Sequence, residues 1–152
     1  MSNGIFMDNE RIKKTARYLS DLGDRKRRIN ILKKEIAILK EKEKYSEINF
    51  NELGFKIKTS PKGLDEMIAN TEQQIVMKEA EIEHVEKRIK IVYAYLEELP
   101  QDERRLIELK YFYDKYEKMS MTKIAMEIKC CREYVYYKHK KALEKLSNML
   151  SI

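Results

Sequence analysis

Residues 120–146, SMTKIAMEIKCCREYVYYKHKKALEKL, carry the clearest structural signal in this chain. A short helical pattern runs from Thr122 to Ile128 and is followed by a break of two or three residues. A longer helical pattern then begins near Cys131. Two helices joined by so short a break predict a helix-turn-helix, whose second helix enters the major groove of DNA. We expect the rest of the chain to position and multimerise this stretch.

The second of these helices has one apolar face and one basic, aromatic face. Val135, Ala142, Leu146 and Leu150 predict the inward stripe. Outward Arg and Lys side chains suit guanine edges and phosphates, Glu accepts from cytosine, and Tyr contacts a thymine methyl or a phosphate. A solvated basic face is the alternative. The predicted DNA-binding residues are Thr122, Lys123, Cys131, Arg132, Glu133, Tyr136, Tyr137, Lys140 and Lys141, with Lys138 as a further phosphate contact.

Composition favours long helices. The 152 residues are 38% charged and 43% hydrophobic, with only four Gly and two Pro, fewer glycines than the turns of a parallel-sheet enzyme need. The net charge of +6 is unevenly spread. Residues 24–45 carry nine basic (Lys or Arg) and four acidic (Asp or Glu) residues. Residues 64–99 carry four basic and nine acidic residues, and residues 120–152 carry seven basic and three acidic residues. The first two segments complement each other, which leaves the basic C-terminal segment to meet an external anion.

Two apolar stripes predict a long antiparallel helical hairpin over residues 1–99. Ile29, Leu32, Ile36 and Leu39 repeat at three and four, and Ile31 and Ile38 widen that stripe. A longer stripe continues without a slip from Leu64 to Leu99. Because it exceeds what the first helix can cover, we expect packing on a second subunit as well. Residues 46–63 lose the period and predict the connecting loop.

Residues 100–152 predict a small three-helix domain, so the fold class is all-α. Its first helix, about 102–113, should face inward through Leu106, Leu109, Phe112 and Tyr113. The aromatics 111–116 predict core packing, with a base-stacking platform as the alternative. Ser120 is the expected N-cap, and Ile124, Ala125 and Ile128 the buried set of the next helix.

Two further features of the N-terminal hairpin leave alternatives open. Gly23 predicts either a helix end or a weak point in one long helix. The cluster Arg25-Lys26-Arg27-Arg28 predicts a solvated helix face or, alternatively, a second phosphate-contacting patch.

The chemistry-bearing residues do not form a catalytic or metal-binding pattern. The two cysteines, Cys130 and Cys131, are adjacent and lack a zinc-knuckle spacing, and there are only two His. No Gly-rich phosphate loop or nucleophile–base pattern occurs. We therefore expect no cofactor, no metal and no enzymatic activity. No signal peptide or apolar run near the ~20 residues of a membrane span is present, which favours the cytoplasm.

The C-terminal third resembles region 4 of bacterial sigma factors. The resemblance rests on Leu99-Pro100, Arg104, Leu109-Lys110-Tyr111, Lys123-Ile124-Ala125, Val135 and Ala142-Leu143-Glu144-Lys145-Leu146. Three positions depart from that pattern: Lys129 stands where the turn usually has Gly, Cys131 replaces the usual Ser, and Lys138 occupies a normally apolar position. With the N-terminal hairpin and a Ser-Pro-x-Gly linker, the chain is similar to phage late-transcription activators of the RinA and ArpU kind.

This resemblance implies a sequence-specific DNA-binding regulator of transcription, encoded by a phage or prophage. Its partners would be double-stranded DNA, a second copy through the long helices, and RNA polymerase. Two alternatives remain open: a coiled-coil interaction protein that contacts RNA polymerase, and a small DNA-packaging subunit of the terminase kind.

Overall fold

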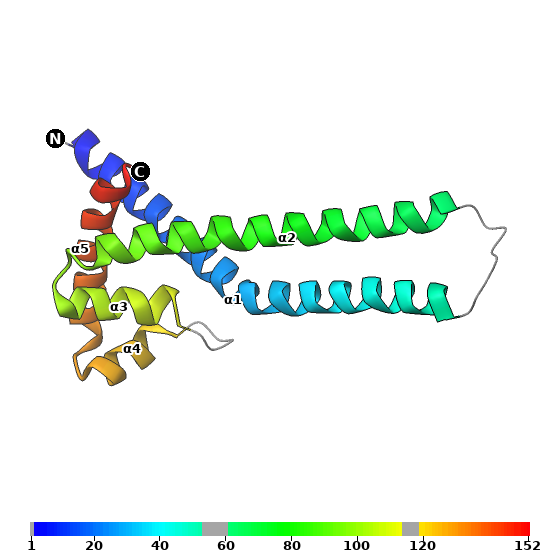
Figure 1. Cartoon of the computed structure of the whole chain (residues 1–152). Helices are drawn as coiled ribbons and strands as arrows, with labels where there is room; N and C mark the ends of the chain where they lie inside the picture. Colours follow the sequence, from blue (N-terminus) through cyan, green and yellow to red (C-terminus); the bar gives the residue numbers. More distant parts are fainter. Residues whose placement is uncertain (1, 53–60, 114–118) are drawn as a thin grey trace. The chain divides into compact units, whose positions relative to one another are not determined.

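The computed structural model describes the backbone of residues 2–52, 61–113 and 119–152, and the side chains of residues 9–44, 65–113 and 119–152. Across these residues the chain is helical and contains no strand, which confirms the all-α fold class (Figure 1). The helices are α1 (Ser2–Glu52), α2 (Pro61–Leu96), α3 (Gln101–Tyr111), α4 (Met121–Ile128) and α5 (Arg132–Leu150).

The two long helices extend further than the apolar period predicts. α1 passes through Gly23 without a break and continues to Glu52, and α2 begins at Pro61. The predicted loop 46–63 is therefore wrong at both ends, and its centre, 53–60, lies outside the described residues. Losing an apolar stripe does not end a helix, because its backbone hydrogen bonds persist without tertiary contacts. Pro61 suits a first helical position, where its missing N–H breaks no intrahelical bond.

The chain divides into two compact units, residues 28–85 and residues 1–27 with 86–152. The predicted boundary at 99/100 does not follow this division. The start of α1 and the end of α2 belong with the C-terminal helices, because side-chain contacts join them. Each unit is described by itself.

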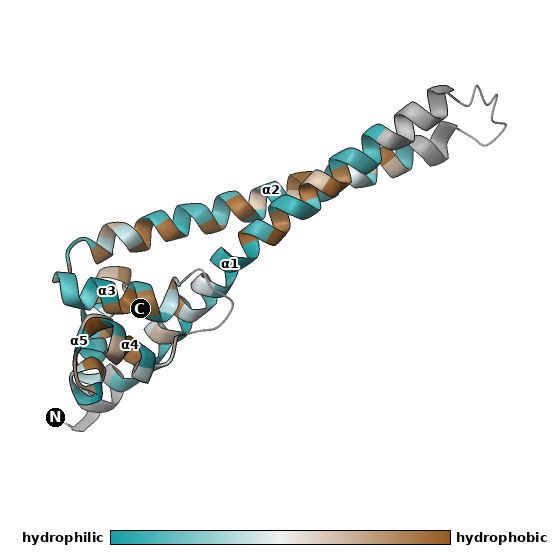
Figure 2. Cartoon of the chain, turned by 90° about the horizontal axis from the view of Figure 1, so that it is seen from below, coloured by the Kyte–Doolittle hydropathy of each residue, from teal (hydrophilic) through white to brown (hydrophobic). Residues whose placement is uncertain are grey.

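The unit of residues 28–85 is an antiparallel helical hairpin. Ile29, Leu32 and Ile36 of α1 are buried, as are Ile75, Ile82 and Val85 of α2. Ion pairs cross between the helices; among them are Lys78 Nζ to Glu35 Oε2 at 2.5 Å and Lys40 Nζ to Glu79 Oε1 at 3.5 Å. Hydrophobic and hydrophilic residues alternate along both helices (Figure 2).

One part of the predicted stripe in α1 is wrong. Ile31 and Ile38 do not widen the buried stripe; they are 50% and 63% exposed. At about 100° per residue they lie roughly opposite Ile29 and Ile36, so they cannot reach the seam that α2 fills.

The other unit is built on α3, α4 and α5, which pack on one another. Leu106, Ile107, Tyr111 and Phe112 are the buried apolar residues of the first helix and the residue after it. The predicted inward pair Leu109 and Tyr113 is only half-buried, and Tyr116 lies outside the described residues. Burial of Tyr111 and Phe112 confirms core packing for these two aromatics. The remaining core residues of this unit are Leu19, Leu22, Val92, Leu96, Leu99, Met119, Met121, Ile124, Ala125, Val135, Ala142, Leu143 and Leu146.

α1 crosses the C-terminal end of α3 at Gly23. A β-carbon on this residue would overlap the carbonyl oxygen of Tyr111. Just beyond, Lys26 Nζ donates to the Phe112 carbonyl at 3.3 Å, and Arg27 Nη1 donates to the carbonyls of Tyr111 and Tyr113 at 3.3 and 3.2 Å. These cations satisfy carbonyl groups at the negative end of the α3 dipole. Neither a solvated face nor a phosphate patch describes these two members of the basic cluster.

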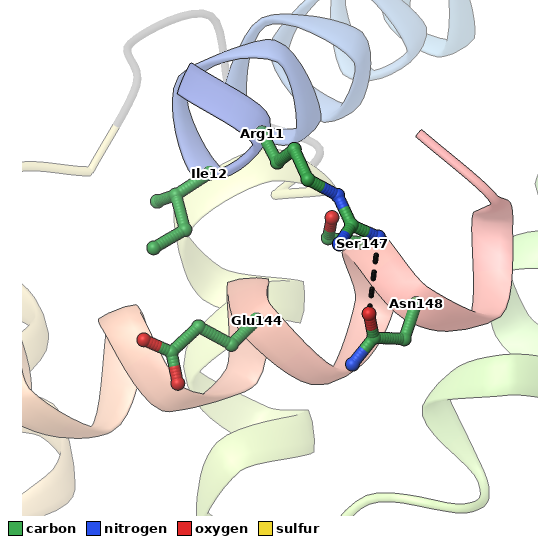
Figure 3. A pocket seen from close by; sticks show the side chains of 5 residues that line it. All are labelled: Arg11, Ile12, Glu144, Ser147 and Asn148. Carbon is green, nitrogen blue, oxygen red and sulfur yellow. Dashed lines mark hydrogen bonds between the residues drawn. The ribbon is translucent and has the colours of Figure 1, made fainter. Parts of the chain in front are cut away.

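α1 also contacts the end of α5. Arg11 Nε donates to the main-chain oxygen of Ile152 at 2.7 Å, and Arg11 Nη2 donates to Asn148 Oδ1 at 3.0 Å. A cavity of about 180 Å³ remains beside this contact, lined by Arg11, Ile12, Glu144, Ser147 and Asn148 (Figure 3). Polar bonds from Arg11 to the end of α5 thus lie at the edge of this cavity.

Candidate nucleic-acid interface

The turn between α4 and α5 is fixed by backbone hydrogen bonds. Lys129 has left-handed dihedral angles, φ 61° and ψ 43°. Its N–H donates to the Met126 carbonyl at 3.3 Å, and the Cys130 N–H donates to the Ala125 carbonyl at 3.0 Å. This pair of bonds is a Schellman motif, which ends α4 and redirects the chain within two residues. The geometry forms although a lysine occupies the left-handed position.

The beginnings of the two helices are set differently. The Ser120 side chain accepts a hydrogen bond from the Lys123 N–H at 3.3 Å, which confirms the predicted N-cap of α4. Cys131 stands at the corresponding position of α5 and makes no side-chain cap bond. Both cysteines are free thiols, Cys130 half-buried and Cys131 exposed. α5 therefore starts without the cap bond that a serine would supply.

One face of α5 packs on the domain core. Val135, Ala142 and Leu146 are buried as predicted, Leu143 and Ser147 join them, and Leu150 is half-buried. In α4, Ile124 and Ala125 are buried as predicted, whereas Met121 is buried and Ile128 only half-buried. The inward faces of both helices thus fix which residues point outward.

All nine predicted DNA-binding residues are exposed. The structure brings them onto the start of α4, the residue before α5 and the outward side of its first three turns; they are Thr122, Lys123, Cys131, Arg132, Glu133, Tyr136, Tyr137, Lys140 and Lys141. Exposure makes them available to a ligand, while contact with DNA remains a prediction.

Two cations of this face lie against tyrosines one turn away. The Arg132 guanidinium lies 5.5 Å from the Tyr136 ring centre, and its Nη2 donates to the Tyr136 hydroxyl at 3.4 Å. Lys141 Nζ lies 4.7 Å from the Tyr137 ring centre. Spacing of four residues brings such side chains together on a helix, and the ring face attracts the cation. Both tyrosines thus restrict where the neighbouring positive charges lie.

Lys138, which the sequence predicts as a phosphate contact, is instead half-buried in an acidic cluster. Its Nζ lies 3.4 Å from Asp102 Oδ2 and 3.8 Å from Glu103 Oε1. Glu103 is buried and also binds Lys145 Nζ at 3.0 Å. A buried carboxylate needs such partners, because an unpaired buried charge is costly. The lysine at this normally apolar position therefore helps to neutralise a buried carboxylate of α3.

Tyr134 belongs to the same cluster and is absent from the predicted set. Its hydroxyl donates to Asp102 Oδ2 at 3.0 Å. Partial burial opposes ionisation of Asp102, but hydrogen bonds from Tyr134, the Glu103 N–H and Lys138 together lower the pKa of this carboxyl. The four-residue spacing of Tyr134 and Lys138 was the available sequence signal for this cluster.

A further titratable side chain of α5, His139, also turns inward. Its Nε2 lies 2.7 Å from the Tyr111 hydroxyl, and the two rings stack with centres 5.7 Å apart. Burial, helped by the charge of Lys110, lowers the pKa of His139 to about 4, and burial also raises the pKa of Tyr111. This histidine is therefore neutral near pH 7 and joins α5 to α3.

Within the described part of the chain, no three His, Cys, Asp or Glu residues come close enough to form a metal-binding group. Nor is any helix there long and apolar enough to cross a membrane.

The turn, the buried inner faces and the exposed outer face of α5 define a helix-turn-helix domain of the kind that binds DNA. The model of the family "Sigma-70, region 4" matches residues 95–148. This match supports a sigma-70 region 4-like helix-turn-helix, and with it DNA binding in general. Comparisons with curated proteins and with solved structures gave no match for this chain.

Proposed function

We propose that this chain is a sequence-specific DNA-binding regulator of transcription. α5 would enter the major groove of promoter DNA, and the start of α4 would meet the backbone beside it. The observation that carries the proposal is that the nine predicted residues are all exposed, at the start of α4 and from Cys131 to the third turn of α5, in a domain that resembles sigma region 4. The resemblance to phage late-transcription activators favours phage or prophage promoters as targets and the bacterial cytoplasm as location.

The proposed roles follow from side-chain chemistry and position on α5. Arg132 and Glu133 lie in the first turn, where a recognition helix meets base edges; Arg can bind guanine with two bonds and Glu can accept from cytosine. Tyr136 and Tyr137 follow one turn later. Their hydroxyls can reach phosphates and their rings can contact a thymine methyl.

Cations surround this base-reading part of the helix. Lys140 and Lys141 are exposed on the third turn of α5, and Lys123 is exposed in the first turn of α4. Lysine acts as a mobile point charge and so suits phosphates, which position the helix without reading sequence. We assign Thr122 to the same role.

DNA binding by the full chain at rising salt tests the proposal. Fluorescence anisotropy with duplex DNA from a phage promoter should show a steep fall in affinity with salt, because cations that bind phosphates release counterions. The variant Arg132→Ala/Lys140→Ala should weaken binding and flatten the logarithmic salt slope by about 0.9 for each phosphate that is no longer neutralised. Removal of the Arg132 side chain should also relax the preference at one base position.

A matched control separates this site from general charge. Lys13→Ala/Arg17→Ala removes the same charge from exposed positions of α1 outside the helix-turn-helix, and binding should change little. Equal weakening in both double variants, or a flat salt response of the unmodified chain, would contradict the proposal. Retention on RNA polymerase without DNA would instead favour the interaction-protein hypothesis, and high-order rings in solution the packaging-subunit hypothesis.

A further inference from the structure

The helical hairpin of residues 28–85 carries a second apolar face that the hairpin itself does not cover. Ile31 and Ile38 are seven residues apart, so they lie on one side of α1. Their exposed fractions are 50% and 63%, and Met77 of α2 is 64% exposed. Large exposed apolar side chains that share one side of a hairpin can form an interaction surface.

Helix geometry places these three side chains on the same side of the hairpin. A residue advances about 100° around its helix, and α2 runs antiparallel to α1, so the sense of rotation is reversed between them. When the angle of each side chain around its helix axis is counted from the buried seam, Ile31, Ile38 and Met77 all lie on one side of the plane through the two helix axes. Val76, which is 63% exposed, turns to the opposite side.

The ion pairs between the helices show which residues of α1 and α2 lie at the same height along the hairpin. Glu35 pairs with Lys78, and Lys40 pairs with Glu79. Ile38 lies between the two α1 members of these pairs, and Met77 directly precedes the two α2 members. Ile38 and Met77 therefore lie at nearly the same height on neighbouring helices.

The two helices of the hairpin carry opposite charge. Residues 28–44 have six Lys or Arg and three Glu, and residues 65–85 have one Lys and six Asp or Glu. If a second hairpin packed on the apolar face with its α1 on α1 and its α2 on α2, charges of equal sign would meet. If it packed with its α1 on α2, opposite charges would meet. Charge complementarity therefore favours the second arrangement.

The geometry points to a second copy of this chain as the occupant of the face. The two hairpins pack with α1 of each on α2 of the other, about a twofold axis parallel to the helices, and form a four-helix bundle. Ile38 of one copy then packs against Met77 of the other, because such an axis preserves height along the bundle.

Light scattering on the full chain without DNA tests this self-association separately from DNA binding. The unmodified chain is expected to be a dimer. Met77→Glu and Ile38→Glu each place a charge in the apolar interface and should raise the dissociation constant at least about tenfold. Val76→Glu is the matched control: it changes the adjacent, equally exposed residue on the other side, and the dimer should persist. Circular dichroism checks that helicity is kept in all three variants.

Cross-linking tests the pairing of the helices. In a Cys130→Ser/Cys131→Ser background, a mixture of Ile38→Cys and Met77→Cys chains should form a covalent dimer with a short bis-maleimide, whereas Ile38→Cys chains alone should not. Salt should weaken the dimer, since it screens the complementary charges. A monomeric unmodified chain, dissociation by Val76→Glu instead of Met77→Glu, or efficient cross-linking of Ile38→Cys chains alone would each overturn the proposal.

Discussion

Lys129 holds a backbone conformation that lysine rarely adopts. Its φ of 61° puts the β-carbon close to the following carbonyl, which costs about 1–2 kcal/mol for residues other than glycine. The Schellman bonds of Cys130 and Lys129 to α4 hold the turn nevertheless. The resemblance to sigma region 4 suggests glycine at this position, and the positive φ gives the reason, because glycine has no β-carbon and adopts left-handed angles at no steric cost.

Substituting this residue should therefore stabilise the protein. Lys129→Gly removes the steric cost, while the greater conformational entropy of glycine in the unfolded chain offsets part of the gain. We expect a net increase of about 0.5–1 kcal/mol in the free energy of unfolding. Urea titration followed by circular dichroism measures it as a higher midpoint at unchanged slope. Lys129→Ala removes the same charge but keeps a β-carbon, so it should give no such gain. A comparable rise for alanine would show that charge, not backbone geometry, is responsible.

His139 should make stability depend on pH in a defined window. Its folded pKa of about 4 lies below the ordinary value of about 6.5, so the unfolded chain binds more protons between these values. Stability should therefore fall as the pH is lowered from 6.5 to 4, by about 3 kcal/mol from this residue. His139→Gln keeps a polar partner for Tyr111 and should flatten the profile over that window. Unfolding midpoints at each pH measure the difference between the two proteins, and parallel profiles would contradict the prediction.

At the scale of whole elements, α1 shows how packing overrides local preference. Gly23 in the middle of a helix costs stability relative to alanine on propensity alone, by about 0.5–1 kcal/mol. The sequence therefore marks it as a helix end or a weak point. In the structure the helix continues, and the missing β-carbon lets α1 approach the Tyr111 carbonyl, where Arg27 also binds.

The sign of the stability change on Gly23→Ala separates the effect of helix propensity from the effect of close packing. Gly23→Ala should destabilise the protein by about 1–3 kcal/mol, because the added methyl overlaps main-chain atoms that cannot shift freely. Thermal unfolding measures the change. Ala37→Gly, at an exposed position of the same helix, reports the propensity effect alone and should cost about 0.5–1 kcal/mol. A stabilised Gly23→Ala variant would mean that α1 does not cross α3 so closely.

The elements of the candidate site were the most predictable part of the chain. Ser120, the break after Ile128 and the spacing of Val135, Ala142 and Leu146 are local signals, and the structure confirms the cap, the turn and the inward face. Lys138 was mispredicted, because its acidic partners lie on α3, some 35 residues before it in the sequence. No local pattern on α5 shows that a lysine there has a buried carboxylate beside it.

On the scale of the molecule, the helix-turn-helix domain shares its compact unit with residues from α1. Leu19 and Leu22 are buried in this unit, and Arg11, Lys26 and Arg27 bind the ends of α5 and α3. The part that resembles sigma region 4 thus has packing partners beyond its own three helices.

A fragment of residues 95–152 should therefore be less stable than the same residues in the full chain. Without α1, the apolar surface that Leu19 and Leu22 cover is open to water, and each such side chain contributes about 1.5–3 kcal/mol when fully buried. Hydrogen exchange of the α5 amides measures the difference between the two forms, as faster exchange in the fragment. A fragment containing residues 1–27 fused through a flexible linker should recover the protection. Equal protection in the short fragment would contradict this account.

The all-α fold, the buried stripes of the hairpin, the helix-turn-helix and the exposure of the six predicted DNA-binding residues of α5 could be predicted from local sequence patterns. These follow from periodicity, capping and turn chemistry, which act over a few neighbouring residues. The roles of Gly23, Lys26, Arg27 and Lys138, and the exposure of Ile31 and Ile38, became clear only from the packing of the helices. Those depend on which surfaces of distant helices meet, because burial and charge pairing are properties of the packing between elements and leave no periodic trace in either one.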